Sequence, residues 1–162
     1  MVEPFAVFEK FVRLTNGLVY AEAECAVPDH PFESRNIHPC LPRIVRDLFD
    51  DGHCAQATFE AFKYVDKQVA RLGLSNESGE KLMMSAFSEV TPLISLTPRS
   101  NISEKDEQRG YKFLFAGAIV AIRNPRGHEY AVHDTPDECL DHLALASTLL
   151  RRLEGTGAKL GS

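Results

Sequence analysis

Three polar residues near the C-terminal end of the chain have the types and the spacing that chemistry on a phosphate requires. Arg123, Asn124 and His128 occur within the sequence RNPRGH. An arginine stays charged at any cellular pH, and its planar guanidinium can hold two phosphate oxygens at once. A histidine gains and loses a proton near neutral pH, and an asparagine amide can orient either group by hydrogen bonding. The motif is therefore a candidate site for phosphate chemistry.

A long helix is expected to lead into this motif. Residues 108–122 carry apolar side chains at helical spacing, namely Leu114, Phe115, Ala118, Ile119 and Ile122. Pro125 lacks a backbone donor and costs ~3 kcal/mol inside a helix, so the helix is predicted to end or kink around Asn124. His128 would then lie on a bend, close to Arg123.

The rest of the chain also shows helical patterns. Further helices are predicted over residues 4–14, from Pro39 or Pro42 to residue 49, and over 53–72, 78–88 and 135–153. Residues 16–36 and 91–102 contain prolines and are expected to be irregular, and residues 17–23 form at most a lone strand. The sequence predicts an all-α bundle of about five or six helices. Residues 1–35 would form an N-terminal extension, 36–154 the helical domain and 155–162 a flexible tail.

Composition restricts the classes of function. The chain of 162 residues has no apolar run near the ~18 residues of a membrane span and no secretory signal, so we expect a cytoplasmic protein. Its four scattered cysteines are expected to stay reduced. A net charge of −5 argues against a general nucleic-acid coat, so any nucleic acid would be held at a focused site.

The motif in its helical context resembles a known superfamily. The string Arg123-Asn124-x-x-x-His128, between two helices of an all-α chain, resembles the signature of the HEPN superfamily. A longer pattern over residues 36–153 is similar to the uncharacterised Ymh-like HEPN branch of bacteria and phages. Its parts are His38-Pro39, Gly52-His53-Cys54-Ala55-Gln56-Ala57, Glu60-Ala61, Leu82-Met83, Gly117-Ala118, Arg123-Asn124-Pro125 and His128. The resemblance implies a metal-independent endoribonuclease, typically a toxin or antiphage defence effector, in which two copies share a cleft.

The motif residues suit RNA cleavage by the 2′-hydroxyl of the RNA itself. That reaction needs a base, an acid for the leaving 5′-oxygen and positive charge beside the phosphorane. His128 could act as the base, Arg123 could hold the phosphate oxygens, and Asn124 could orient either partner. In a homodimer a second His128 could supply the acid, and general acid–base help is worth ~10²–10⁴ in rate.

Four further residues are candidates for RNA binding or support. Glu60 could pair with Arg123, and Arg126 could contact phosphate. Lys63 and Lys67, which share a helix face with Arg71, could follow an RNA backbone.

Structural readings of the same residues stay open. Arg123 and His128 could satisfy helix-end carbonyls, Arg126 could be an exposed loop cation, and the lysines could form a solvated face. His133 and Glu129 follow the motif and could assist it.

No metal or cofactor is expected. His38, Cys40, His53 and Cys54 could in principle bind zinc, but their spacings match no established zinc pattern. A phosphate-cradling glycine loop and a nucleophile motif are also missing.

Two classes of function remain. The first is a ribonuclease that a partner, such as an antitoxin or another regulatory protein, restrains. The alternative is a non-catalytic HEPN-like module that binds nucleotide or RNA or serves as a dimerisation platform. The sequence carries no mark of the RNA target or the activating signal.

Overall fold

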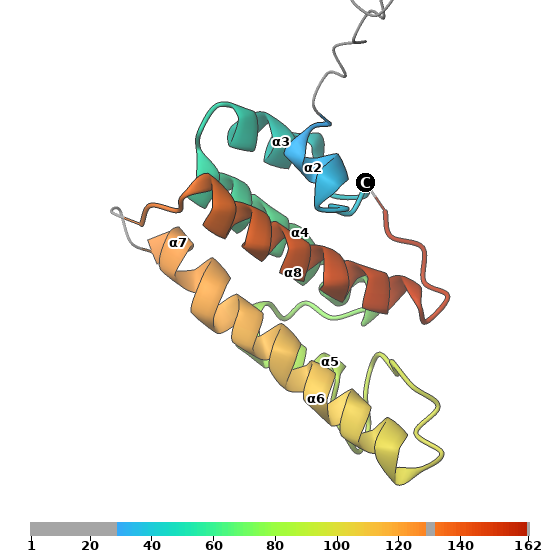
Figure 1. The fold of residues 1–162 in the computed structure, drawn as a ribbon. Helices are drawn as coiled ribbons and strands as arrows, with labels where there is room; N and C mark the ends of the chain where they lie inside the picture. Colours follow the sequence, from blue (N-terminus) through green and yellow to red (C-terminus); the bar gives the residue numbers. More distant parts are fainter. Residues whose placement is uncertain (1–28, 129–131, 162) are drawn as a thin grey trace, which may run out of the picture. The chain divides into compact units, whose positions relative to one another are not determined.

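A computed structural model describes residues 29–128 and 132–161, and every regular element in these ranges is a helix (Figure 1). The all-α prediction is confirmed. The helices are α2 (Pro31–Ser34), α3 (Arg43–Asp50), α4 (Cys54–Leu72), α5 (Gly79–Ala86), α6 (Ile102–Ala118), the π-helix η1 (Ile119–Arg123), α7 (Asn124–His128) and α8 (Pro136–Glu154). All of them belong to one compact unit, Pro31–Ser162. The helix predicted over residues 4–14 and the strand considered at 17–23 lie outside the described residues.

Helix α4 is the central element of the bundle. It packs against α3, α5, η1, α7 and α8, and Figure 1 shows it running alongside α8. Its fully buried residues include Ala57, Ala61, Phe62, Val65 and Val69. Because these side chains cover more than one stripe of the helix, α4 contacts several neighbours at once. Residues on α4 are therefore well placed to support a site on α7 or on α8.

Two helix boundaries agree with the predicted ranges, the start near residue 135 and the end at residue 72. Helix α8 begins with a capping box in which the Thr135 side chain accepts from the Glu138 backbone, and Pro136 occupies the first turn. Helix α4 ends at Leu72 with Gly73 as its C-cap residue.

Helix α6 begins earlier than predicted, at Ile102 instead of residue 108. The Asn101 side chain accepts a hydrogen bond from the Glu104 backbone N–H at 2.9 Å. The Glu104 carboxylate in turn accepts from the Ser100 backbone N–H at 2.6 Å. These bonds satisfy donors at the helix start, so the helix extends across polar residues that show no apolar period.

The prediction that this helix ends near Asn124 is wrong. Helices α6, η1 and α7 follow one another without a break to His128 (Figure 1). The Asn124 N–H donates to the carbonyl of Ile119, five residues earlier, which makes η1 a π-helical turn. Pro125 cannot donate a backbone hydrogen bond, and this wider turn directly precedes it. The helix accommodates the proline by widening into a π-helical turn, so it does not end at this point.

Two segments expected to be irregular are ordered. Pro31 begins the short helix α2, as suits a residue that fits a first helical turn. After α8, the Gly161 carbonyl accepts hydrogen bonds from Tyr64 Oη at 2.6 Å and Gln68 Nε2 at 2.8 Å. Leu160 packs against the core. This last segment is held on α4, which differs from the flexible tail expected over 155–162.

No helix in the described part of the chain is both long enough and apolar enough to cross a membrane.

Candidate functional site

Arg123 ends η1 as a half-buried cation without an acidic partner among the described residues. Its guanidinium carbon lies 5.6 Å from the centre of the Phe59 ring, on α4. Its Nη1 donates to Asn124 Oδ1 at 3.2 Å, and its buried Nε has no acceptor. An unpaired guanidinium that an aromatic ring holds in place is suited to receive an anion.

His128 is the last residue of α7, and its side chain is exposed. The expectation that a bend brings it beside Arg123 is wrong, because the backbone stays helical between them. In an α-helix, five residues correspond to a rotation of about 140° and a rise of about 7.5 Å. One copy of the chain therefore carries Arg123, Asn124 and His128 within two helical turns, but Arg123 and His128 leave the helix on different sides.

Phe59 is a site residue that the sequence analysis did not identify. Besides Arg123, it contacts Lys63, whose Nζ lies 5.8 Å from the ring centre. A Cβ atom at Gly127 would lie only 2.8 Å from Phe59 Cε2. The absence of a side chain at Gly127 thus lets α7 approach the ring, which no feature of the RNPRGH string reveals.

Arg126 is not the exposed loop cation that was considered. Its Nε donates to Asp134 Oδ2 at 2.7 Å, its Nη2 donates to Asp134 Oδ1, and both side chains are almost fully buried. Its Nη1 also donates to the Ile122 carbonyl at 2.7 Å. Arg126 therefore joins the end of α7 to the residues before α8, and its charge is already neutralised. A direct role in phosphate binding is not supported by this geometry.

Asp134 connects Arg126 to two further helices. It accepts a hydrogen bond from Thr58 Oγ1 of α4 at 2.9 Å, and His142 Nδ1 of α8 lies 3.7 Å from its Oδ2. Burial acts to raise the pKa of the Asp134 carboxyl, but the hydrogen bonds from Arg126 and Thr58 outweigh it and lower the pKa. Burial and the Arg126 charge lower the pKa of His142. The aspartate therefore remains ionised and fixes the position of α7.

Cys139 lies beside this network in a chemically inert setting. It is fully buried, and its thiol donates to the Cys54 carbonyl at 3.3 Å. Burial raises the pKa of the Cys139 thiol to about 12. The thiol is therefore protonated at neutral pH and unsuited to act as a nucleophile.

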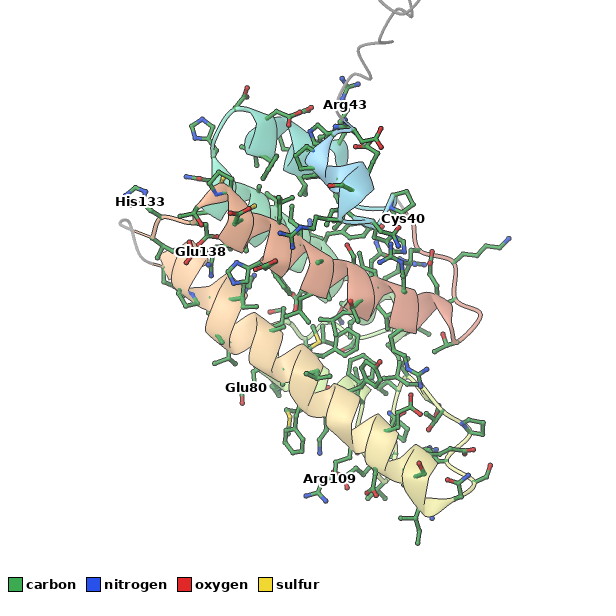
Figure 2. The ribbon with its side chains drawn as sticks, in the orientation of Figure 1. Cys40, Arg43, Glu80, Arg109, His133 and Glu138 are labelled. Carbon is green, nitrogen blue, oxygen red and sulfur yellow. The ribbon has the colours of Figure 1, made fainter. Side chains whose placement is uncertain are left out.

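The predicted supporting residues on α4 lie near the motif, but their ion pairs differ from those that were expected. Glu60 accepts from Lys63 Nζ at 2.8 Å, and no hydrogen bond or ion pair joins it to Arg123. Lys67 is exposed on the next turn. His133 is exposed just before α8 (Figure 2), and Glu129 lies outside the described residues.

A possible metal cluster differs from the four residues considered in the sequence. Donor atoms of His38, Cys40 and Glu154 lie within 4.8 Å of one another, without His53 or Cys54. His38 Nε2 contacts Glu154 Oε2 at 2.9 Å, and His38 Nδ1 accepts from the Cys40 backbone N–H at 3.1 Å. These bonds assign the proton to Nε2 and use both ring nitrogens.

Comparisons with known proteins identify one family. No curated protein and no solved structure matches the chain. A family model described as "Protein of unknown function (Hypoth_ymh)" matches residues 35–153, which include Phe59, Arg123, His128 and Asp134. The match covers most of the chain, and the relation to the HEPN superfamily stays a prediction. The chain belongs to the Hypoth_Ymh family.

Proposed function

We propose that this protein is a metal-independent endoribonuclease of the HEPN type that acts as a toxin or antiphage effector. The observation that supports this most is the contrast between two nearby arginines. Arg126 is neutralised by Asp134, whereas Arg123 has no acidic partner in the described part of the chain and lies one helical segment before the exposed His128. A guanidinium left free for an anion and an accessible imidazole five residues later are both groups that suit a phosphodiester.

In the proposed reaction His128 removes the proton of an RNA 2′-hydroxyl. The 2′-oxygen attacks the adjacent phosphorus, and the bond between phosphorus and the 5′-oxygen breaks. Arg123 stabilises the negative charge on the non-bridging oxygens, and the leaving oxygen takes up a proton. The products are a 2′,3′-cyclic phosphate and a 5′-hydroxyl end, and no step needs a metal or a cofactor.

A homodimer would complete the site. Because Arg123 and His128 of one copy leave the helix on different sides, a second copy would bring its own guanidinium and imidazole to the same linkage, and its imidazole could give the proton to the leaving oxygen. An exposed apolar face along α6 and η1, ending near the motif, supports this arrangement. Its residues are Gly110, Phe113, Leu114, Gly117, Val120 and Ala121. None of these six residues is charged, although Lys112 Nζ lies 4.7 Å from the centre of the Phe113 ring, and the glycines would let another helix approach closely.

The same proposal includes a restraining partner. A ribonuclease that acts on the RNA of its own cytoplasm must be held inactive until needed, so we propose an antitoxin or another regulatory protein. The net charge of −5 agrees with binding at a focused cationic site instead of general attraction to RNA.

The test is incubation of the purified protein with total RNA in excess chelator, followed by mapping of the cleaved ends. We expect cyclic-phosphate ends, and His128→Ala should slow cleavage by ~10²–10⁴-fold without changing the helical circular dichroism spectrum. His53→Ala is the matched control, because His53 is also exposed and its side chain makes no cap hydrogen bond. Equal cleavage by the His128 variant and the wild type would exclude the proposed base.

The alternative is a non-catalytic HEPN-like module that binds RNA or nucleotide or mediates dimerisation. The separation of Arg123 and His128 on one helix favours it if the chain acts as a monomer. RNA binding that depends on Arg123, together with no cleavage under any condition, would identify this alternative.

A further inference from the structure

A cavity of about 840 Å³ lies where α4 meets the loop before α3 and the last described residues. Three of its lining residues are cations, Arg43, Lys67 and Arg71, and none is acidic. The other contributors include Tyr64, Gln68 and Leu160. A concave site that combines three cations with apolar walls matches a ligand that carries both a phosphate and a ring or sugar.

The charges of this cavity are only weakly balanced by neighbouring acids. Lys67 is exposed and has no ion pair among the described residues. The Arg43 side chain is 92% exposed, and its nearest carboxylate oxygen, of Asp47, is 3.6 Å away. Arg71 bonds to neutral groups, the Gln68 side chain and the Lys159 carbonyl. The cavity therefore attracts anions.

A row of side chains connects this cavity with the Arg123 site. Phe59, Lys63, Lys67 and Arg71 follow each other at intervals of four residues along α4, and residues at this interval are neighbours on a helix surface. The row covers about 18 Å at 1.5 Å per residue. It begins at the ring that holds Arg123 and ends in the cavity wall.

We propose that a single-stranded RNA cleaved at Arg123 and His128 continues along this row and places a second phosphate among Arg43, Lys67 and Arg71. This inference rests on the proposed ribonuclease function and identifies the substrate as a strand that extends beyond the cleaved linkage. Lys63 lies on the route, but Glu60 offsets its charge. Lys67, which has no ion pair among the described residues, and Arg71, whose partners are neutral, therefore contribute most of the attraction that is free for RNA, and Arg43 adds a 92% exposed cation.

The test measures binding of a labelled single-stranded RNA as a function of salt. His128→Ala is used as the background so that the RNA stays intact. Lys67→Ala and Arg43→Ala should each reduce the slope of log affinity against log salt by ~0.7, the value for one phosphate contact on a single strand. Lys105→Ala is the matched control, because it removes an exposed cation from α6 and should leave the slope unchanged. Arg71 is left intact because it also holds the last segment of the chain.

A second measurement compares the cleavage rates of a short and a long substrate, and it uses proteins that keep His128. A dinucleoside monophosphate has one phosphate and cannot reach the cavity, so Lys67→Ala should cleave it as fast as the wild type does. A longer oligonucleotide should be cleaved more slowly by Lys67→Ala at subsaturating concentration. If the salt slopes are unchanged and Lys67→Ala cleaves both substrates as fast as the wild type does, the RNA route is wrong, but the assignment as a ribonuclease is not affected. Failure of the wild type to cleave either substrate would refute the ribonuclease itself.

Discussion

Arg123 and Arg126 show how the surroundings give two identical side chains different roles. Arg126 meets the Asp134 carboxylate with two of its nitrogens, whereas Arg123 lies on the Phe59 ring without an acid. Their spacing in sequence does not distinguish them. The difference comes from Asp134 and Phe59, which the fold brings to α7 from other segments. Because Asp134 neutralises Arg126, Arg123 is the cation of the motif that can accept a phosphate.

The Arg126 and Asp134 pair should be important for stability. Asp134→Ala leaves a nearly buried guanidinium without its counter-charge, and we expect a loss of ~3–5 kcal/mol in the free energy of unfolding, measured by urea denaturation. Replacing both residues, by Arg126→Met with Asp134→Leu, should cost less than Asp134→Ala alone. Asp141→Ala is the control: it breaks the exposed pair with Arg35 and should cost at most ~1 kcal/mol. Similar losses for Asp134→Ala and Asp141→Ala would contradict the assigned role.

The pH dependence of this loss follows from the lowered pKa of Asp134. A carboxyl with a lowered folded pKa stabilises the fold above its unfolded pKa of ~3.9, and this stabilisation disappears as the pH falls through the folded pKa. The difference in unfolding free energy between wild type and Asp134→Ala should therefore be present at about pH 5 and above, where Asp134 is ionised, and shrink in stronger acid.

At the scale of the elements, local signals could be predicted and long-range ones could not. The start of α8 after Thr135 and the end of α4 before Gly73 depend on residues close in sequence, and the predicted helix start at 135 and helix end at 72 are confirmed. The Asn101 and Glu104 signal was equally local, but it was missed because the apolar period begins only later. The π-helical turn before Pro125 is different. The helix after Pro125 makes long-range contacts, with Phe59 beside Gly127 and Asp134 bonded to Arg126, so a proline that predicts a helix end instead lies within a continuous helix.

Gly127 offers a test of how closely α7 approaches α4. Gly127→Ala would place its Cβ 2.8 Å from Phe59, and the forced shift of the ring should cost ~1–3 kcal/mol and slow RNA cleavage through Arg123. Gly110→Ala is the matched control on α6, where a Cβ meets nothing of the same chain within 4 Å, and both variants are compared with Leu114→Glu added so that pairing through the apolar face plays no part. There the better helix propensity of alanine should add ~0.5–1 kcal/mol. Thermal unfolding of both variants measures the difference, and stabilisation by both would show that Phe59 moves freely.

At the scale of the whole molecule, the continuous helix formed by α6, η1 and α7 joins an apolar face to a polar end. Leu114 and Phe113 are each 52% exposed on this helix, and Arg123, Asn124 and His128 follow at its end. A second copy that covers the apolar face would also lie beside the motif. The bundle and the motif could be inferred from the sequence. Because an expected bend proved to be a helix, the placement of Arg123 and His128 on different sides could not.

A mixing experiment tests whether two copies share one site. If cleavage needs one His128 as base and the other as acid, a dimer that contains a single His128→Ala copy is inactive. Adding an equal amount of His128→Ala protein, with time for subunit exchange, should then lower the activity of a fixed amount of wild type by about half, because random pairing places half of the wild-type copies in mixed dimers.

The control variant combines His128→Ala with Leu114→Glu, which puts a charge on the apolar face and should prevent pairing. It should leave the wild-type activity unchanged, and its mass in solution should be that of a monomer. The contrary result is that proteins that keep Leu114 form dimers while His128→Ala leaves the wild-type activity unchanged. In that case each copy cleaves with its own histidine, and the proposal of a shared site is wrong.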